Sequence, residues 1–402
     1  MLKMLSAPYL TLPLTFRCQP NFGNESVTSE RTSNAQTNGN NQGDFVDVST
    51  VRQSAEGSKR VQDSTRCGIR HSTFGIRHLV SPMRILSGIQ PSGALHIGNY
   101  FGMMQPAVAL QTEGEALYFI ADYHALTSLR DPQALRANSR RVALDFLACG
   151  LDPERATLFR HSDVPQVTEL AWILSTVAPM GLLERAHSYK DKLARGVSAT
   201  VGLFSYPILM AADILIYDSD VVPVGKDQKQ HIEITRDLAV KMNETFGEIF
   251  KLPEARIQPT TETVPGIDGQ KMSKSYGNNI DIFGDEKETR KRVMSIVTDS
   301  TPVEAPKDPD KSTIFKLYSL VASTDEIADM RERFLKGGAG YSEFKNQLFE
   351  KLWEYFAPMR KRREEILRDK SYIDDVLAHG AKRANEIANQ VMQRVRRAVG
   401  LR

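Results

Sequence analysis

Cysteine is scarce in this chain, and long apolar stretches are missing altogether. Only 3 of the 402 residues are cysteine, namely Cys18, Cys67 and Cys149. They are odd in number and far apart, so neither a disulfide framework nor a zinc site is expected, and a reducing compartment fits. No stretch reaches the roughly 18 consecutive apolar residues that a membrane-spanning helix requires. We therefore expect a soluble protein with no membrane partner.

Acidic side chains are missing from the start of the chain, where no Asp or Glu precedes Glu25. Residues 1–82 are rich in Ser, Thr, Asn, Gln and Gly and show no apolar periodicity. Such a segment cannot bury enough apolar surface to offset the entropy of ordering, so we expect disorder. An acid-poor, Arg-bearing, Ser-rich N-terminus is typical of transit peptides, which predicts import into a mitochondrion or chloroplast. The alternative is a disordered tail without a targeting role.

A strong charge of either sign is also missing, because 52 Lys and Arg face 49 Asp and Glu and leave a net charge of +3. This total is too small to indicate a nucleic-acid partner, so any RNA contact has to come from a local patch. With 41% hydrophobic residues, 402 residues suffice for two folded domains.

Residues 83–285 alternate between strand-like and helix-like segments. We expect strands at 84–87, 117–121, 157–161 and 221–224, and helices at 96–110, 132–148, 164–177 and 228–246. This alternation is typical of a parallel sheet covered by helices, which is an α/β fold. Residues 286–402 lack strand signals and predict an all-α domain, with helices at 312–322, 342–370 and 373–399.

The helical C-terminal domain carries a local excess of positive charge. The last 52 residues contain 13 Lys or Arg and 7 Asp or Glu, with clusters at 360–363 and 394–397. A charge run of this kind is usually a solvated helix face. RNA contact is the sharper alternative.

The first chemical motif spans residues 87–99, where a strand is expected to end, a Pro/Gly turn follows and a helix begins. Backbone N–H groups and the positive helix end then point at one place, which suits a triphosphate. His96 and Asn99 offer donors to phosphate or ribose oxygens, and Gly98 allows close approach. The alternative for His96 is that it only caps the helix.

The second motif is the basic loop Lys271-Met272-Ser273-Lys274-Ser275. Two lysines three residues apart can wrap a phosphate chain and stabilise the negative charge that develops on a leaving pyrophosphate. On its own the pentapeptide could be a surface loop. The ionised carboxylate of an amino acid attacks without a general base, so catalysis is expected to rest on positioning and electrostatics.

A substrate block lies between the two motifs. On a helix, Met210 and Asp213 share one face, so that a thioether lies beside a carboxylate. This pair matches an indole, which is a large apolar ring with one N–H donor and no acceptor. The alternatives are that Asp213 pairs structurally and that Met210 belongs to the core.

These motifs resemble the His-Ile-Gly-His and Lys-Met-Ser-Lys-Ser signatures of the class I aminoacyl-tRNA synthetases. Asn99 stands where the general pattern has histidine, but Gly-Asn is common in the tryptophan-specific branch. From Arg84 to about Val399, and through residues 184–192, the chain resembles the bacterial-type tryptophanyl-tRNA synthetases.

The resemblance implies a Rossmann-like, doubly wound parallel sheet with a helical dimerisation insertion at about 164–202 and an anticodon-binding domain at 286–402. It also implies a homodimer that uses ATP and Mg²⁺, the metal being held mainly by the ATP phosphates with no metal site of its own. The expected activity is activation of L-tryptophan and its transfer to tRNA(Trp) for organellar protein synthesis.

Site residues follow from the same resemblance. The expected ATP contacts are Gln90, Pro91, Ser92, Gly98, Asn99, Gly225, Lys226, Asp227, Val264, Lys271, Met272, Ser273, Lys274 and Ser275. Catalysis is assigned to Gln90, His96, Asn99, Lys271 and Lys274. Tryptophan is expected to contact His124, Tyr206, Met210, Asp213 and Gln228, with Lys190 and Lys192 nearby.

Three other functions were weighed for the chain. A tyrosyl-tRNA synthetase typically has Gln where Met210 stands, to meet a phenol that donates and accepts. A small-molecule nucleotidyltransferase lacks the long helical C-terminal part and the full second motif. A non-catalytic RNA-binding relative predicts damaged motifs, whereas Gln90, Gly98, Lys271 and Lys274 are intact.

Overall fold

The computed structural model describes residues 82–91, 93–186, 189–190, 200–225, 228–257 and 264–401. All of them belong to the compact unit Arg77–Arg402. The expected leader up to residue 81 lies outside the described residues, as do Ser92, Lys192, Lys226 and Asp227.

A five-stranded parallel sheet forms the centre of this unit. Its strands are β1 (Arg84–Ile89), β2 (Glu115–Ile120), β3 (Ala156–Arg160), β4 (Val221–Val224) and β5 (Glu254–Ile257), in the order β3-β2-β1-β4-β5. This order reverses direction between β1 and β4, as in a doubly wound sheet. The predicted fold class is confirmed.

The fifth strand was not predicted. β5 has the sequence Glu-Ala-Arg-Ile and no fully buried residue, because it pairs only with β4 at the edge of the sheet. An edge strand of four residues carries no continuous apolar run, so the sequence offers no signal for it.

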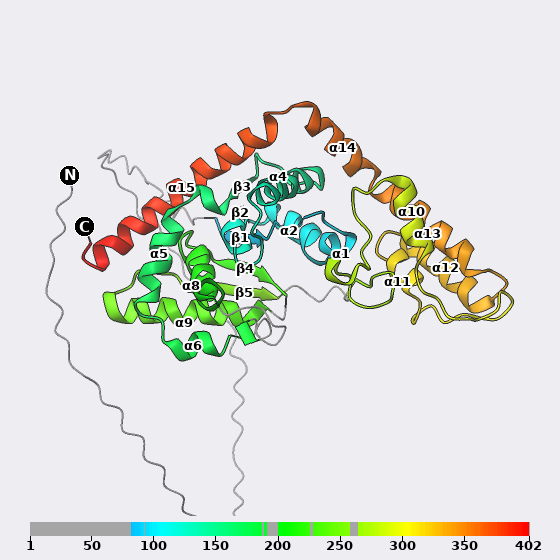
Figure 1. Ribbon diagram of the computed structural model, residues 1–402, viewed down its shortest axis with the longest axis horizontal. Coiled ribbons are helices and arrows are strands. Elements are labelled where there is room, and N and C mark those ends of the chain that lie inside the picture. Colours follow the sequence, from blue (N-terminus) through cyan, green and yellow to red (C-terminus); the bar gives the residue numbers. More distant parts are fainter. Residues whose placement is uncertain are drawn as a thin grey trace, which may run out of the picture. The chain divides into compact units, whose positions relative to one another are not determined.

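Apolar side chains of β2 alternate between the two faces of the sheet. Tyr118 belongs to the cluster on one face, and its neighbours Leu117 and Phe119 belong to the cluster on the other. The helices around the sheet are α4 (Pro132–Ala148), α5 (Gln166–Ser175), α6 (Met180–Glu184), α8 (Val201–Leu215) and α9 (Lys229–Phe246) (Figure 1). The faces are therefore covered on both sides, as the doubly wound fold requires.

The helix expected at 96–110 is divided. It consists of α1 (Ile97–Asn99), a π-helical turn η1 (Tyr100–Met104), α2 (Gln105–Ala109) and a 3₁₀ turn η2 (Leu110–Thr112). Pro106 lies in the first turn of α2 and has no N–H to donate, so the hydrogen-bond register changes immediately before it.

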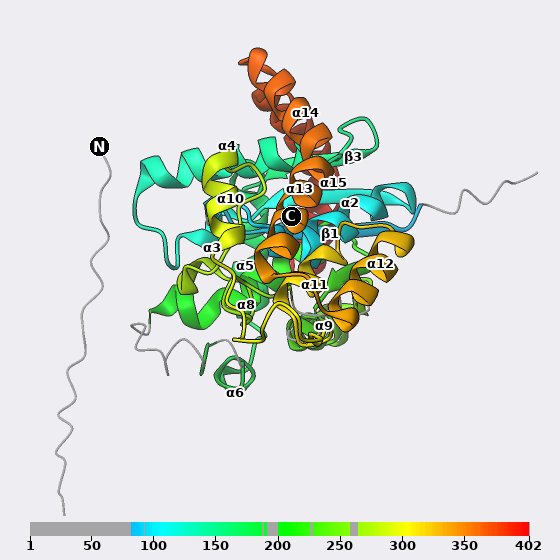
Figure 2. The same cartoon turned by 90° about the vertical axis from the view of Figure 1, so that its right-hand side faces the viewer.

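The C-terminal helices also differ in detail from the expectation. They are α10 (Glu286–Met294), α11 (Thr313–Tyr318), α12 (Thr324–Lys336), α13 (Tyr341–Tyr355), α14 (Ala357–Arg368) and α15 (Tyr372–Ala398), and Figure 2 views them from the side of α10 to α13. The single helix expected at 342–370 breaks at Phe356, because Pro358 favours the first turn of a new helix.

Helix α15 returns to the sheet and lies along the outer strand β3 (Figure 1). Its approach depends on Gly380, because a Cβ there would lie 1.9 Å from the carbonyl oxygen of Leu158. Arg394 pairs with Asp218, and Arg396 pairs with Glu169 on α5. Helix α15, although it belongs to the predicted C-terminal domain, therefore packs on the sheet. The division of the chain into domains at residue 285 stays a prediction.

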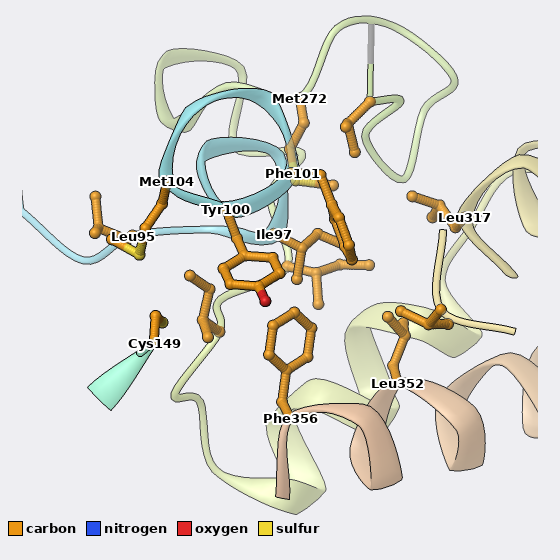
Figure 3. Close-up of a cluster of buried hydrophobic side chains, with 14 of the residues drawn as sticks. Leu95, Ile97, Tyr100, Phe101, Met104, Cys149, Met272, Leu317, Leu352 and Phe356 are labelled. Atoms are coloured by element: carbon orange, nitrogen blue, oxygen red, sulfur yellow. The ribbon is translucent and has the colours of Figure 1, made fainter. Parts of the chain in front are cut away.

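An apolar cluster joins the two motifs to the C-terminal helices. Figure 3 shows Tyr100 facing Phe356, which lies at the start of α14. Phe101 and Met272 of the second motif lie above them in this view. The rings of Tyr100 and Phe356 meet edge to face at 5.1 Å between centroids. The described helices include none long and apolar enough to cross a membrane.

Candidate functional site

A cavity of about 500 Å³ lies where the strand order reverses. Strand β1 ends just before Gln90 and β4 ends just before Gly225, and both residues line the cavity. Ligands of open α/β sheets bind at this switch point, beyond the carboxyl ends of the strands. The cavity also includes the predicted tryptophan contacts His124, Tyr206, Met210, Asp213 and Gln228.

Helix α8 supplies three of these side chains on one face. Thr200 caps the helix by accepting a hydrogen bond from the Leu203 N–H, which fixes where the helical register starts. Tyr206, Met210 and Asp213 then follow at spacings of four and three residues. The sequence expectation that Met210 and Asp213 share a face therefore holds, and both reach the cavity.

The Asp213 carboxylate is buried between two imidazoles. Its Oδ2 lies 2.7 Å from Nε2 of His124, and its Oδ1 lies 2.7 Å from Nε2 of His161. Burial alone would raise the pKa of Asp213, but the two histidines outweigh it, so its pKa lies below the usual value. The carboxylate is thus kept ionised and can accept a hydrogen bond.

The two histidines come from the ends of neighbouring strands. His124 lies in α3 (Asp122–Ala125), directly after β2, and His161 opens the 3₁₀ turn η3 (His161–Asp163) directly after β3. Reasoning from the sequence missed His161. The only available signal was its position at the carboxyl end of a predicted strand, next to that of β2.

Aromatic and small residues complete the walls. The Tyr206 hydroxyl lies 3.5 Å from Nε2 of His231, another residue that the sequence did not single out, and burial raises the pKa of Tyr206 to about 12. Gly88 is required beside Phe119, because a Cβ there would lie 2.4 Å from the ring. Lys190, expected nearby, is exposed.

The first motif is held by reciprocal capping of α1. His96 Nδ1 accepts a hydrogen bond from the Asn99 N–H at 3.3 Å, and Asn99 Oδ1 accepts one from the His96 N–H at 3.2 Å. His96 therefore caps α1 through its Nδ1. Burial and the neighbouring Lys274 lower the pKa of His96 to about 4. A neutral imidazole that accepts at Nδ1 carries its proton on Nε2, which leaves that N–H for a ligand.

The second motif is organised by a buried asparagine. Asn278 accepts a hydrogen bond from the Ser273 N–H at 2.7 Å and donates to Asp268 at 2.8 Å and to the Lys271 carbonyl at 3.1 Å. The side chains of Lys271 and Ser275 are exposed. Val264, expected near adenine, is buried, and its carbonyl accepts from the Met272 N–H at 3.0 Å.

The two motifs lie against each other. The Ile97 N–H donates to the Ile280 carbonyl at 2.9 Å, and a Cβ on Gly98 would lie 3.2 Å from Cβ of Met272. A Cβ on Gly93 would lie 3.6 Å from Nζ of Lys274 and 3.9 Å from Oδ1 of Asn138. Asn138, on α4, is a further neighbour of Gly93 that the sequence did not indicate.

Electrostatics around Lys274 favour an incoming anion. Burial lowers the pKa of Lys274, Asp281 opposes this shift and Arg141 adds to it. The neighbouring Asp145 is buried and receives a hydrogen bond from Arg363 of α14 at 3.0 Å. A phosphate chain between the motifs would add further negative charge beside this partly desolvated ammonium group.

One group of potential metal ligands occurs in the described part of the chain, formed by His124, His161 and Asp213. His124 and Asp213 of this group line the cavity. No second group of this kind occurs among the described residues.

Comparisons with known proteins show to which family the chain belongs. Residues 80–357 match the family of class I tRNA synthetases for W and Y. The tryptophan–tRNA ligase of Fusobacterium nucleatum is 54% identical over 79% of this chain and 98% of its own length. That of Rhodopirellula baltica is 54% identical over 80% of this chain and 100% of its own length.

Structural similarity points to the same family. The Campylobacter jejuni tryptophanyl-tRNA synthetase complexed with ADP and tryptophan is 51% identical, has a TM-score of 0.76 and covers 79% of this chain and 100% of its own. The family match at residues 80–357 spans the sheet and both motifs. This chain therefore belongs to the bacterial-type tryptophanyl-tRNA synthetases of class I.

Proposed function

We propose that this chain is a tryptophan–tRNA ligase that forms tryptophanyl-adenylate and pyrophosphate from L-tryptophan and ATP, then transfers tryptophan to the 3′ terminal adenosine of tRNA(Trp). The observation that carries the substrate is the ionised Asp213 carboxylate, buried in the cavity wall beside Met210. An apolar ring with one N–H donor satisfies this pair, whereas a phenol hydroxyl leaves its acceptor capacity unused.

Activation places the tryptophan carboxylate against the α-phosphate of ATP. Bond formation at phosphorus releases pyrophosphate, whose growing charge meets Lys271, Lys274 and the Nε2–H of His96. No side chain has to remove a proton, so the rate enhancement comes from positioning and from cations aimed at the leaving group. In the second step, a terminal ribose hydroxyl of the tRNA attacks the adenylate carbonyl and AMP leaves.

Magnesium would accompany the ATP phosphates. The phosphate motifs contribute lysines, serines and backbone N–H groups, which bind phosphate oxygens but do not replace metal ligands. Mg²⁺ usually keeps several waters and binds through phosphates. The ATP phosphates would therefore supply most of its ligands other than water. Titrating Mg²⁺ at fixed ATP tests this, with activity expected to follow the Mg·ATP concentration.

The test of substrate identity is ATP–pyrophosphate exchange with each of the twenty amino acids. Tryptophan should support exchange, and Asp213→Asn should reduce kcat/KM for tryptophan about tenfold to a hundredfold by removing the charged acceptor. Stimulation by tyrosine instead of tryptophan would overturn the assignment. Failure with every amino acid would favour the non-catalytic relative.

The tRNA contact is proposed for the C-terminal helices. Several of their arginines are committed inside the chain: Arg363 bonds to Asp145, Arg394 to Asp218 and Arg396 to Glu169. Lys361 and Arg397 are exposed and are the better candidates for RNA. Lys361→Ala and Arg397→Ala should raise KM for tRNA and leave pyrophosphate exchange unchanged. Loss of exchange would contradict the assignment.

A homodimer is proposed through the segment near 164–202. Trp172 on α5, Met180 on α6 and Val201 on α8 are exposed by 72%, 63% and 82%, which is unusual for large apolar side chains. Sedimentation of the wild-type chain should give twice the mass of one chain, and Trp172→Asp should yield monomers. A wild-type monomer at micromolar concentration would contradict the proposal.

Organellar targeting is proposed for residues 1–82 on composition. Fusing this segment to a fluorescent protein should direct the fusion to mitochondria, plastids or both, and the chain from residue 83 should remain in the cytosol. Uniform cytosolic fluorescence of the fusion would contradict targeting.

A further inference from the structure

His161 is a buried polar group to which the proposed reaction gives no role. It follows β3, and its side chain is 2% exposed. Neither signature contains it. Buried histidines without a partner are costly, so its surroundings should reveal what it does.

The imidazole of His161 is fixed on several sides. Its ring stacks on His124 at 5.6 Å between centroids, and it meets Tyr123 and Phe119 edge to face at 4.9 and 5.5 Å. Nε2 then lies 2.7 Å from Oδ1 of Asp213. A ring held in this way cannot leave the carboxylate without disturbing the wall of the cavity.

Charge favours the same arrangement. Burial alone would lower the pKa of His161, but the Asp213 carboxylate raises it, with a smaller contribution from Asp122. The charged or titratable groups that face His161 are Asp213, Asp122, His124 and Tyr123. Both carboxylates thus hold the pKa of His161 above its ordinary value.

The Asp213 oxygen that can accept a hydrogen bond from a substrate is Oδ1. Oδ2 is engaged by His124, whereas Oδ1 makes no aligned hydrogen bond within the described residues despite its closeness to His161. Oδ1 is therefore attracted electrostatically and still has a lone pair to offer. A carboxylate oxygen can accept from two donors at once.

We propose that His161 is a positioning residue for substrate selection, which fixes the Asp213 carboxylate so that Oδ1 presents a lone pair to the N–H of an aromatic ring. The site thereby selects amino acids whose ring carries an N–H donor over isosteres without one. This inference rests on the proposed tryptophan activity and deepens it.

A metal ion in place of this ion pair is the main competing arrangement, because two histidines and one carboxylate can ligate a transition metal. The distances argue against it. Ligands around a tetrahedral zinc lie roughly 3.3 Å apart, given metal bonds of about 2.0 Å. Both nitrogen–oxygen separations here are 2.7 Å, which suits direct pairing.

The experiment compares tryptophan with β-(benzothiophen-3-yl)alanine, in which sulfur replaces the ring N–H at nearly unchanged shape. Pyrophosphate exchange gives kcat/KM for both substrates with wild type, His161→Ala, His161→Gln and Asp213→Asn. Phe159→Leu is the matched control, since Phe159 is buried on the same strand and packs on Phe119 and Tyr217. It changes packing without touching Asp213.

Wild type should prefer tryptophan over the sulfur analogue by about tenfold to a hundredfold, the value of one buried hydrogen bond to a charged group. His161→Ala should raise KM for tryptophan, leave KM for ATP unchanged and shrink the preference to a few-fold. His161→Gln, which keeps an N–H donor, should restore most of it. Phe159→Leu should affect both substrates by one common factor.

Coupling provides a second readout. If His161 acts through Asp213, adding His161→Ala to Asp213→Asn should lower the preference no further, because both changes remove the same interaction. Circular dichroism and thermal unfolding show whether each variant is folded. If His161→Ala does not fold, His161→Gln with the double variant still decides the question.

Three results would overturn the inference. A His161→Ala enzyme that loses the same factor with both substrates makes the residue merely structural. Fully additive effects in the double variant separate it from Asp213. Stoichiometric zinc in purified wild type, lost on His161→Ala, makes the histidine a metal ligand. If the wild-type enzyme shows no ATP–pyrophosphate exchange with tryptophan, the proposed function itself is contradicted. That result is distinct from the three results that concern His161.

Discussion

His96 and Asn99 cap each other, with Nδ1 of the histidine accepting the asparagine N–H at 3.3 Å. The bond requires an unprotonated Nδ1, which agrees with a pKa of about 4 for His96. The proton of the neutral ring is then on Nε2. A residue expected to be a phosphate donor thus also fixes the helix start.

The lowered pKa predicts a pH dependence of stability. Because the folded-state pKa of about 4 lies below the ordinary 6.5, the unfolded chain binds more protons in this window, and stability falls as pH drops from 6.5 towards 4. At pH 5 the His96 contribution should be a loss on the order of 2 kcal/mol. Urea unfolding at pH 7.5 and 5 measures it, with His96→Gln as control. Equal losses in both proteins would contradict the assignment.

Lys274 should contribute mainly to the chemical step. Lys274→Ala removes a cation near Gly93 and the first motif, so kcat for pyrophosphate exchange should fall about a hundredfold to a thousandfold, with KM for tryptophan little changed. Lys311→Ala is the control, because Lys311 is exposed and follows the second motif by more than thirty residues in the sequence. A change confined to KM for tryptophan would place Lys274 in the wrong site.

Asn278 should control the shape of the basic loop. Asn278→Ala removes three hydrogen bonds that join the loop to its base and leaves the Ser273 N–H without its acceptor, while Asp268 keeps the bond from the Gln270 N–H. We expect kcat to fall about tenfold and Tm to decrease by a few degrees. Asn279→Ala, which removes a bond to Asp281 only, should have the smaller effect on kcat. The reverse order would be incompatible with this role.

Met210 should contribute through apolar contact. Met210→Gln places an amide against the indole, and kcat/KM for tryptophan should fall about tenfold, the cost of an unpaired polar group. Met210→Leu keeps the apolar character and should lose less. Tyrosine should remain a poor substrate of Met210→Gln because Asp213 and His124 still line the cavity. Kinetics with both amino acids check this.

Gly380 should be intolerant of a side chain. A Cβ there would lie 1.9 Å from the Leu158 carbonyl oxygen, so Gly380→Ala forces α15 away from β3 and should cost about 1–3 kcal/mol of stability. Gly102→Ala meets no atom within 4 Å and is the matched control. Urea unfolding of both compares them. Equal stability would show that α15 can shift without loss.

The sequence predicted those helices and motifs whose structure depends on neighbouring residues in the chain. The spacing of Met210 and Asp213 on one helix placed both in the cavity, because helical periodicity is fixed by geometry. Helix α4 runs from Pro132 to Ala148, as expected, since Asp131 is a strong N-cap and Gly150 follows its end. The two motifs, both of which the resemblance assigned to ATP, lie against each other.

Long-range partners could not be read from the sequence. The places of His161 and Asn138 depend on which strands and helices become neighbours, and single positions carry no such information. The short strand β5 lacks an apolar run because it lies at the edge of the sheet, where one of its sides has no partner strand. Sequence therefore indicated the substrate pocket but not the group that orients its carboxylate.

The contact between α15 and β3 has a consequence for biosynthesis. A ribosome makes the chain from the N-terminus, so β3 leaves the exit tunnel more than two hundred residues before the end of α15, which is residue 398. Until then the outer strand of the sheet offers unpaired backbone groups to other chains. Nascent chains that stall before α15 should therefore be captured by chaperones or self-associate, and the last helix acts as the closing step of folding.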